Sequence, residues 1–526
     1  MTPGRDVHGF EASAAVAAEM LLSSASVLVI GHIDADGITA ASIADFALDR
    51  AKIPREIMFV KKLDALEVNR AAAHPAEKVW FVDLGSGALS SLDSERFIIT
   101  DHHQVDLGGR SERKGHVNPH MFGIDGSSEV SGAGVTYAVA KRMGPNNDDL
   151  AALAVVGAVG DYQESAEGRL AGYNRTILGD AIASGQITAE KDVRLFGRQT
   201  RPVHALLQYS SEPSLMPFIT GERVKTDAAF VDPVDEEGEK MAVIDFLEEL
   251  GIVLVKDGSF RTWCQLGLVE KRTIVSALVE RILDSGKGLP LVRRLIGEAY
   301  TLTPNLPGAP LGWLTGLEEG APKDSNGFAW RPSARALLDA KEFSTLLNAC
   351  GRHERADVGL QICLGNREGA LCIALEQQDD HRRRLREALD LVRISPSHMA
   401  RTVTKEGVEL KAVRYFHGGS EIGDTIVGIV AGMLLSSRNF PTDRPLIAFA
   451  QSGDGTCTVK VSGRGTKDLV RRGMDLAQAM RSAAEIAGGN GGGHNIAAGA
   501  TVPEGREEEF LLAIDDIISA QMGPSV

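Results

Sequence analysis

Four short segments of the chain bring together carboxylate and imidazole side chains, the groups that bind metal ions and transfer protons. The first is GHIDADG, in which His32, Asp34 and Asp36 recur at every second residue. If this segment is extended, the three side chains project to one side. An aspartate-rich turn that caps a helix is the structural alternative. A calcium-binding loop is excluded, because Ile38 and Thr39 occupy the positions where such a loop needs a ligand and a glycine.

The other three segments each follow an apolar stretch. Asp83 lies in VDLGSG, Asp101, His102 and His103 are consecutive in ITDHHQVD, and Asp161 ends VVGAVGD. Each of them alone is compatible with a polar loop or a helix end. Together the four segments supply hard oxygen ligands and imidazoles without cysteine, a set that suits Mn²⁺ or Mg²⁺ better than Zn²⁺. Two ions about 4 Å apart that share a bridging aspartate could then activate water for attack on phosphorus.

The elements that must position these groups are predicted from apolar runs without alternation, which are typical of buried parallel strands. Strands are expected at residues 27–30, 57–60, 79–82 and 97–100. Helices are expected at residues 12–24, 38–51, 65–72 and 88–93, and then at 132–142, 149–159 and 173–184. This alternation favours an α/β fold with an N-terminal doubly wound parallel sheet. Ligands of such sheets bind at the carboxyl ends of the strands, where the motifs lie.

The rest of the chain is expected to form a mainly helical middle region and a C-terminal α/β domain. The predicted boundaries divide the chain into residues 1–210, 211–335 and 336–526. In the middle, residues 232–240 are expected to be a solvated acidic loop and 303–327 a linker, with helices at 246–250, 273–283 and 290–299. Further on, strands are expected at 362–364 and 371–375, a basic helix at 381–392, a hairpin from 446–450 and 456–462, a helix at 467–486, a strand at 495–502 and a helix at 507–522.

Composition excludes several classes of protein. The 526 residues are 43% hydrophobic and 24% charged, which argues against a disordered or fibrous chain. The formal net charge of −15 excludes a uniformly basic surface for nucleic acid, although a basic groove on an acidic body stays compatible. Five cysteines without close pairing predict reduced thiols. No signal peptide and no apolar run of about 20 residues are visible, so we expect a soluble, cytoplasmic protein without membrane association.

A glycine-rich segment near the C-terminal end, GGNGGGH, is a second candidate ligand site. Consecutive glycines allow backbone N–H groups to converge on an anion. A P-loop is excluded, because Gly493 is followed by His494 and Asn495 rather than by lysine and a hydroxyl residue. A flexible loop is the alternative.

Taken together, these motifs resemble those of the DHH phosphoesterase superfamily. DHH at residues 101–103, with HxDxDG, VDxG and GD around it, carries the resemblance, and SGRG with GGNGGGHNIAAG resembles the companion DHHA1 domain. The whole chain is similar to the archaeal RecJ-like nucleases, and the segment LDAKEFSTLLNACGR strengthens that similarity. The resemblance implies that residues 1–210 form a catalytic DHH domain and that 336–526 contain a substrate-binding DHHA1 domain.

The resemblance also implies a role for each motif residue. Two ions, with Mn²⁺ favoured over Mg²⁺, would be held by His32, Asp34, Asp36, Asp83, His102 and Asp161. Asp83 would bridge the ions, His103 would contact the scissile phosphate, and Asp101 would orient His102. Substrate would be bound by Ser462, Arg464, Gly491, Gly492, Gly493 and His494. Contacts near the cleft are also expected from Tyr415, Phe416 and His417, and the basic helix is either a solvated face or a wall that follows phosphates.

The expected function is that of a metal-dependent exonuclease acting on single-stranded DNA or RNA, with a 5′ to 3′ polarity implied by the resemblance and a role in replication or repair. Two alternatives remain open. One is a scaffold that binds GINS in the archaeal replicative helicase complex. The other is a small-substrate DHH phosphodiesterase acting on oligoribonucleotides or cyclic dinucleotides.

Overall fold

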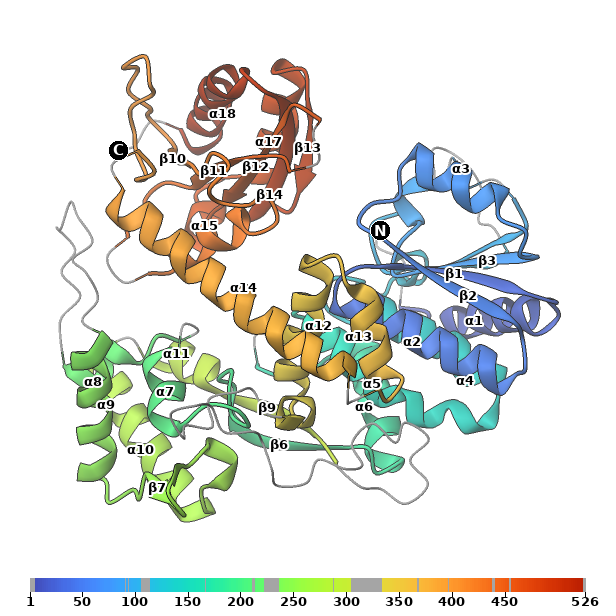
Figure 1. Cartoon of the computed structure of the whole chain (residues 1–526), viewed down its shortest axis with the longest axis horizontal. Helices are drawn as coiled ribbons and strands as arrows, with labels where there is room; N and C mark the ends of the chain where they lie inside the picture. The colour runs from blue at the N-terminus through green and yellow to red at the C-terminus, as the bar shows by residue number, and fades with distance from the viewer. Residues whose placement is uncertain are drawn as a thin grey trace. The chain divides into compact units, whose positions relative to one another are not determined.

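The chain folds into two compact units. The computed structural model describes residues 5–523, apart from 90, 93, 106–113, 166, 211–212, 222–235, 287, 304–333, 367–368, 396, 438–439 and 454–455. The first unit contains the described residues up to 221 together with 236–378, and the second unit contains those from 379 onward. The chain passes from one unit to the other within a single long helix, α14 (Gly369–Ile394) (Figure 1).

A parallel sheet organises the first unit, as the sequence predicts. Its strands are β1 (Val27–His32), β2 (Arg55–Val60), β3 (Lys78–Val82), β4 (Phe97–Thr100) and β5 (His116–Val117), in the order β2-β1-β3-β4-β5. All four pairings are parallel. Val27 and Val29 of β1 are buried in one core, whereas Leu28 and Ile30 are buried in another on the opposite face. Burial on both faces explains the apolar run without alternation.

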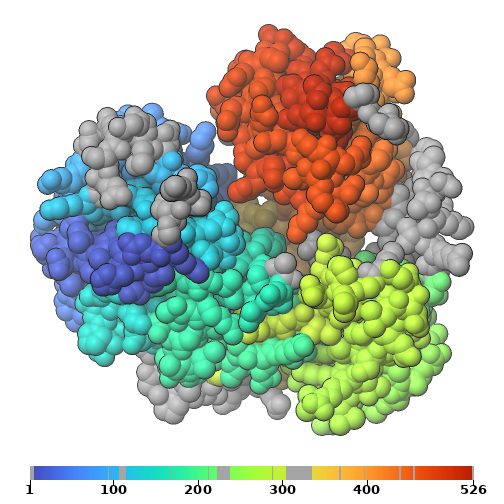
Figure 2. Space-filling view, turned by 180° about the vertical axis from the view of Figure 1, so that it is seen from behind, coloured from blue at the N-terminus to red at the C-terminus, as the bar shows by residue number. Residues whose placement is uncertain are grey.

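Helices cover both faces of this sheet (Figure 1). They are α1 (Val7–Leu22), α2 (Ala35–Arg50), α3 (Ala65–Ala73), α4 (Gly132–Met143), α5 (Ala151–Gly160) and α6 (Gly172–Ala183). In the space-filling view, the dark-blue α1 lies against the cyan segment that contains α4 (Figure 2). The helix expected at residues 88–93 is wrong, since only a 3₁₀ turn forms at Ser86–Ala88 and residue 93 lies outside the described residues.

The middle of the chain adds a small helical body to the first unit. Its elements are α7 (Val203–Gln208), α8 (Met216–Thr220), α9 (Glu236–Glu249), the hairpin β7 (Val255–Lys256) and β8 (Ser259–Phe260), α10 (Leu268–Asp284) and α11 (Gly288–Leu295). The buried Trp263 lies in its core. A ribbon of β6 (Ile187–Val193) and β9 (Ile296–Leu302), paired antiparallel, joins it to the sheet domain.

Three expectations for this region need correction. The acidic segment is helical from Glu236 onward, and its residues 232–235 lie outside the described residues, as does nearly all of the expected linker 303–327. The helix expected at 290–299 ends at Leu295, where β9 begins. The strands expected at 362–364 and 371–375 belong mostly to helices, because a short apolar run in a buried helix has the same appearance in sequence as a buried strand.

Two helices return to the sheet domain before the chain enters the second unit. They are α12 (Ala340–Arg352) and α13 (Ala356–Cys363). Phe343, Leu346 and Leu347 of α12 and Ile362 of α13 are fully buried in the same core as α2 and α5. A segment more than 300 residues from β1 along the chain is therefore part of the core of the sheet domain.

The second unit contains a mixed sheet. Its strands are β10 (Arg414–His417), β11 (Leu446–Gln451), β12 (Thr458–Arg464), β13 (Asn490–Gly493) and β14 (Ala497–Pro503), in the order β10-β11-β12-β14-β13. Only β10 and β11 are parallel, and the predicted hairpin of β11 and β12 is confirmed. The helices are α15 (Val427–Leu435), α16 (Lys467–Arg471), α17 (Leu476–Ile486) and α18 (Glu507–Met522). The single helix expected at 467–486 is interrupted at Gly473, whose φ is 104°.

Two further expectations from the sequence concern the cysteines and membrane-spanning helices. All five cysteines are unpaired. Within the described ranges, no helix has the length and apolar character that crossing a membrane would require.

Candidate metal centre

The first motif sits where β1 ends and α2 begins. The strand ends at His32, and Asp34 caps α2 by accepting a hydrogen bond from Gly37 N at 2.9 Å. Asp36 therefore lies in the first helical turn, so the motif is not extended throughout. Its carboxylate still turns inward and accepts hydrogen bonds from Gly132 N at 2.7 Å and Ala133 N at 3.0 Å. The capping alternative and the ligand hypothesis are thus compatible, since Asp34 caps the helix through Oδ1 while its Oδ2 lies 2.8 Å from His32 Nδ1.

Asp83 lies at the end of β3 and is the most enclosed carboxylate of the site. It is 1% exposed, and its φ of 61° lies in the left-handed region that residues other than glycine rarely adopt. A Cβ on the neighbouring Gly132 would lie 2.3 Å from Asp83 Oδ1, so only glycine fits there. Asp83 Oδ1 is buried without a hydrogen-bond partner among the described residues.

The DHH segment follows β4 and holds two differently oriented imidazoles. His102 Nδ1 donates to Gly126 O at 2.7 Å, which leaves Nε2 directed toward carboxylates: Asp83 Oδ1 lies 3.3 Å away and Asp36 Oδ2 3.7 Å. Asp101 accepts a hydrogen bond from His103 Nδ1 at 2.8 Å. The carboxylate of Asp101 therefore orients the ring of His103, whereas the sequence analysis expected it to orient His102; to His102 it bonds only through the backbone N–H, at 2.8 Å.

Asp161 reaches the same place from the end of α5. Its Oδ2 lies 3.8 Å from His102 Nε2 and accepts a hydrogen bond from the Gln163 amide at 2.9 Å. The helix can come this close because residue 157 is glycine: a Cβ there would lie 2.5 Å from Asp36 Oδ1. The apolar run that ends in GD therefore packs a helix directly against another ligand.

These side chains form three overlapping groups, in each of which the candidate ligand atoms lie within 4.8 Å of one another. The groups are His32, Asp34 and Asp83; Asp83, His102 and His103; and Asp36, His102 and Asp161. Asp83 is shared by two groups and His102 by two. The structure thus brings together all eight residues that the sequence analysis placed at this site, with Asp101 in contact with His103.

Repulsion and burial shape the protonation of this cluster in the metal-free protein. Burial and the charges of Asp36 and Asp34 raise the pKa of Asp83 well above its usual range. Burial and Asp36 likewise raise the pKa of Asp161 to about 6. Although burial opposes it, the adjacent Asp34 raises the pKa of His32 to about 9. Burial is the larger cause of both raised carboxyl pKa values, and repulsion by Asp36 adds to it.

Divalent cations fit this arrangement. Asp83 Oδ1 is a buried polar atom without a hydrogen-bond partner in the described structure, and it faces other ligand atoms. His32 Nδ1 is paired with Asp34 Oδ2 at 2.8 Å. The donors are carboxylates and imidazoles, which suit Mn²⁺ or Mg²⁺. Groups that share Asp83 and His102 can hold two ions close together.

Sequence reasoning missed the contribution of α12. Asn348 Oδ1 accepts a hydrogen bond from Ala35 N at 2.9 Å, in the middle of the first motif. A Cβ on Gly351 would lie 1.8 Å from Ile33 O, so the end of α12 lies directly on the motif's backbone. The only signal for this contact was the resemblance of the segment LDAKEFSTLLNACGR, which contains both residues.

The second unit carries the predicted substrate-binding residues at one end of its sheet. Ser462 and Arg464 lie on β12 and face Gly428 of α15, where a Cβ would lie 2.9 Å from Ser462 Oγ and 2.7 Å from Arg464 Nη2. In the register of the sheet, Gly463 pairs with Ala498, which pairs with Gly493. Gly463, Ala498 and Gly493 thus lie side by side across three strands. Arg464 and His494 each come directly after a member of this row.

The glycine segment is not the loop that we expected. Gly491, Gly492 and Gly493 form the edge strand β13, paired antiparallel with β14. In an edge strand only every second N–H is directed away from the neighbouring strand. The glycines therefore present fewer free donors than a loop whose successive N–H groups converge on an anion. The backbone is nevertheless closely packed, since a Cβ on Gly491 would lie 2.5 Å from Met480 O.

The basic helix and the three aromatic residues 415–417 are the other candidate contacts in the second unit, and each already interacts with neighbouring protein groups. Arg383 and Arg384 of α14 are paired with Asp380 in the same helix, which favours the solvated-face interpretation of the basic segment. Tyr415 and Phe416 are buried in the core. His417 stacks on Phe449 with ring centroids 5.6 Å apart.

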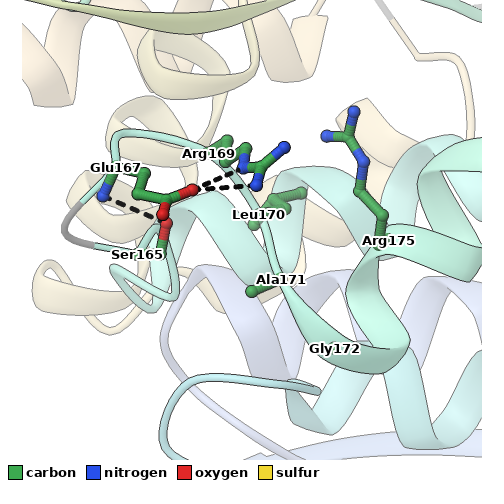
Figure 3. A pocket seen from close by; sticks show the side chains of 7 residues that line it. All are labelled: Ser165, Glu167, Arg169, Leu170, Ala171, Gly172 and Arg175. Carbon is green, nitrogen blue, oxygen red and sulfur yellow. Dashed lines mark hydrogen bonds and ion pairs between the residues drawn. The ribbon is translucent and has the colours of Figure 1, made fainter.

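A separate hollow of about 490 Å³ lies in the first unit, shortly after Asp161 in the chain. It is lined by Ser165, Glu167, Arg169, Leu170, Ala171, Gly172 and Arg175 (Figure 3). Arg169 is paired with Glu167 at 2.8 Å, and Arg175 is paired with Glu298. Because both guanidinium groups already have carboxylate partners, this hollow lacks the free positive charge that a phosphate ligand would need.

Comparison with known proteins agrees with this architecture. Family models match the DHH family N-terminal domain over residues 26–158, the DHH-CID domain over 235–296 and the DHHA1 domain over 411–520. An uncharacterised protein of Methanocaldococcus jannaschii is 27% identical over 505 residues, which are 94% of each chain.

Two solved structures share the fold at low sequence identity. CDC45 from Entamoeba histolytica matches with a TM-score of 0.61 at 12% identity, over 97% of this chain and 99% of its own. RecJ from Thermus thermophilus, solved in complex with Mn²⁺, matches with a TM-score of 0.52 at 16% identity, over 99% of this chain. The match covers 56% of that RecJ, so this chain spans little more than half of its length. The chain therefore combines the DHH, DHH-CID and DHHA1 domains of the DHH/DHHA1 family.

Proposed function

We propose that the protein is a metal-dependent phosphodiesterase that acts as an exonuclease on single-stranded DNA or RNA, with 5′ to 3′ polarity. The observation that carries the proposal is the buried cluster in which Asp83 is shared by two groups of candidate ligands. A carboxylate shared by two ligand groups can hold two ions close together, the arrangement that two-ion phosphoryl chemistry uses. The Mn²⁺ in the Thermus RecJ structure supports a divalent ion at this site, and we favour Mn²⁺ over Mg²⁺.

In this proposal the ions are held by His32, Asp34, Asp36, Asp83, His102 and Asp161. Bound divalent ions supply Lewis acidity at phosphorus and a nucleophile from water at neutral pH. The protein's part is to fix the ligands: the backbone N–H groups at the start of α4 hold Asp36, and Gly126 O holds the His102 ring.

His103 is the group that we assign to the scissile phosphate. Its side chain is 57% exposed, whereas that of His102 is 7% exposed, so it is the accessible imidazole of the pair. Although burial opposes it, the hydrogen bond to Asp101 raises the pKa of His103 to about 9. His103 is therefore protonated at neutral pH and can donate a hydrogen bond or a proton to a phosphate oxygen.

The second unit supplies substrate binding in this proposal. Arg464 and His494 would hold phosphates of the strand, Ser462 would add a hydroxyl, and the backbone of residues 491–493 would allow close approach. We assign catalysis to residues 1–210 and strand binding to the DHHA1 domain within 336–526, and we assign no role to 211–335. We place the activity in DNA replication or repair in the cytoplasm of an archaeal cell.

A nuclease assay with Mn²⁺ tests the proposal. A long single strand labelled at its 5′ end is compared with the same strand labelled at its 3′ end, as DNA and as RNA. We expect the wild type to release labelled mononucleotide first from the 5′ label, and Asp83→Ala to reduce hydrolysis to background. Asp45→Ala is the matched control, because Asp45 lies on α2 but is paired with Arg55 outside the metal centre.

Hydrolysis that persists in Asp83→Ala, or in excess EDTA, would contradict the two-ion site. A dinucleotide and a cyclic dinucleotide in the same assay test the small-substrate alternative. Faster hydrolysis of either than of the long strand would replace the exonuclease assignment with that alternative.

A scaffold role is the second candidate function. It is favoured by the extent of the CDC45 likeness, which covers 97% of this chain and 99% of that protein. In this role the protein would bind GINS within the replicative helicase complex. Co-elution of the purified proteins at micromolar concentration tests it, and the Asp83→Ala variant should co-elute equally well, because binding of this kind does not need the metal centre.

A further inference from the structure

Tyr162 follows the candidate ligand Asp161, and neither packing nor hydrogen bonding accounts for its side chain. The residue is 83% exposed, and its hydroxyl has no hydrogen-bond partner in the described part of the molecule. Its φ of 56° lies in the left-handed region, where a bulky side chain is strained and glycine is not. A strained residue of this kind at the edge of a site is a reason to look for a function.

The turn that presents Tyr162 is firmly attached to the metal centre. Tyr162 N donates to Val159 O at 3.2 Å, and Gln163 N donates to Ala158 O at 3.0 Å. The buried Gln163 amide also donates to Gly126 O at 2.7 Å, the same oxygen that holds the His102 ring. The aromatic ring therefore projects into solvent from a rigid support that shares its hydrogen bonds with a ligand.

Arg352, the last residue of α12, lies on the same side. It is exposed to solvent and has no ion pair among the described residues. Surrounding protein lowers the pKa of its guanidinium by desolvation, which the nearby Tyr162 and Asp34 partly oppose. Gly351, its neighbour in the chain, lies against the first motif, where a Cβ would be 3.6 Å from Asp34 N. An unpaired guanidinium in this position suits a phosphate oxygen, because the donors of its planar fork match oxyanions.

The open side of the metal centre is the side on which these two residues lie. The side chains of Asp34 and Asp161 are 43% and 35% exposed, whereas that of Asp83 is 1% exposed. Tyr162 adjoins Asp161 in the chain, and Arg352 adjoins Asp34 in space. An aromatic ring and a cation therefore lie beside the two exposed carboxylates of the site.

We propose that Tyr162 is a base-stacking platform whose ring stacks on the nucleobase next to the phosphate at the metal centre. The inference rests on the proposed phosphodiesterase function and specifies its substrate: a strand with an unpaired base at the cleaved position. Every nucleobase has a π face, so a ring of this kind binds single strands with little regard to sequence. A base that is stacked and paired in a duplex cannot use the platform in the same way.

The experiment compares a short oligothymidylate with the same oligomer whose two terminal residues lack bases, so that the result does not depend on polarity. Hydrolysis is measured with Mn²⁺ for the wild type and for Tyr162→Phe, Tyr162→Ala and Tyr162→Gly. The control is Tyr209→Ala, which removes an exposed tyrosine directly after α7; the Arg201 guanidinium lies over its ring, away from the metal centre.

We expect the wild type to show a KM about tenfold lower for the strand with terminal bases, the size expected for one base–aromatic stack. Tyr162→Phe and Tyr209→Ala should keep this ratio, and Tyr162→Ala and Tyr162→Gly should bring it to about one. Tyr162→Gly should also raise the midpoint of thermal unfolding, because glycine relieves the backbone strain. Only Tyr162→Gly relieves the strain. If the KM difference between the two strands is lost in both Tyr162→Ala and Tyr162→Gly, it therefore depends on the aromatic ring and not on the strain.

A wild type that treats the two strands alike would overturn the inference, as would a ratio that persists in Tyr162→Ala. If the wild type hydrolyses neither strand, the proposed function fails, and the inference is then decided by binding. Equilibrium affinities for the two fluorescently labelled strands should differ in the wild type and be equal in Tyr162→Ala. Equal affinities in the wild type would refute base stacking independently of catalysis.

Discussion

Two groups of buried carboxylates in the first unit are stabilised in opposite ways. In one, which we call the Arg198 network, Asp192, Asp339 and Glu342 surround the buried guanidinium of Arg198. Arg198 donates to Asp339 Oδ2 at 2.9 Å and to Asp192 Oδ2 at 3.2 Å. Lys271 adds a second cation 3.2 Å from Asp192 Oδ2. In the metal centre, by contrast, the groups that the described structure pairs with the carboxylates are imidazoles.

The difference extends to individual oxygen atoms. Within the Arg198 network, both oxygens of each carboxylate accept a hydrogen bond: Trp263 Nε1 donates to Asp192 at 2.8 Å, and Gln199 N donates to Glu342 at 2.8 Å. Asp339 also caps α12 through Lys341 N at 3.0 Å. In the metal centre, the buried Asp83 Oδ1 has no such donor in the described structure.

This comparison separates two reasons for burying acidic groups. A carboxylate that has a donor for each oxygen needs no ion, and its place in the protein is structural. A carboxylate that is buried without donors destabilises the fold until a cation arrives. Residue type alone does not distinguish the two cases, because both clusters are rich in aspartate.

The largest effect is expected from breaking the Arg198 network. Arg198→Met leaves Asp339 and Asp192 buried without their main partner, and removal of one member of a buried charge pair typically costs about 3–5 kcal/mol. Urea unfolding measures the change in the free energy of unfolding. Arg55→Met is the control, because its pairs with Asp45 and Asp49 are more exposed; an equal loss in both variants would refute a special role of the network.

Metal addition should act on the other cluster alone. An ion that binds only the folded state at a hundred times its dissociation constant stabilises by about 2.7 kcal/mol. We expect Mn²⁺ to raise the midpoint of thermal unfolding of the wild type, and EDTA to reverse the change. Asp83→Asn should lose most of the increase, and Asp192→Asn, in the Arg198 network, should keep the increase. Equal responses of the two variants would contradict the assignment of the metal centre.

The stabilisation by Mn²⁺ should depend on pH. Burial and Asp36 raise the pKa of Asp161 to about 6, so below that pH the ion must displace a proton. The increase in the unfolding midpoint caused by Mn²⁺ should therefore be larger at about pH 7.5 than at about pH 5. A response that is the same at both values would show that this carboxylate is not a ligand.

The smallest effect is expected within the Arg198 network at high pH. Burial and the adjacent Asp339 raise the pKa of Glu342 to about 8. A carboxyl group whose folded pKa is raised contributes stability at low pH and loses it as the pH rises through the folded pKa. Glu342→Gln mimics the protonated group, so we expect it to lose less stability than the wild type between about pH 5 and about pH 9. Urea unfolding across this range should show a flatter pH dependence for the variant.

The parallel sheet and most of the metal centre could be predicted from sequence. The strands that carry the motifs, β1, β3 and β4, are buried on both faces, so their apolar runs are unmistakable. Because the carboxyl ends of parallel strands meet at one edge, the motifs after these strands were expected to converge. The roles of Asp101 and Asp36 were less accessible, since they depend on backbone N–H groups that no sequence pattern displays.

The errors have a common physical origin. Leu371 lies in a helix and not a strand, because a short run of apolar residues fits a buried helix equally well. Gly491 to Gly493 form a strand although glycine has no side chain whose alternation could reveal one; backbone pairing with β14 determines their conformation. The approach of Asn348 to the metal centre joins residues far apart in the chain and has no local signal.

The glycines around the metal centre have a consequence for interpreting related sequences. At residues 132, 157 and 351 a single methyl group would collide with Asp83, with Asp36 or with the backbone of the first motif. A related chain can therefore keep every aspartate and histidine and still be unable to hold them in place, if one of these glycines has been replaced. Whether such a relative is an enzyme or only a binding partner can then be judged from residues that have no functional group at all.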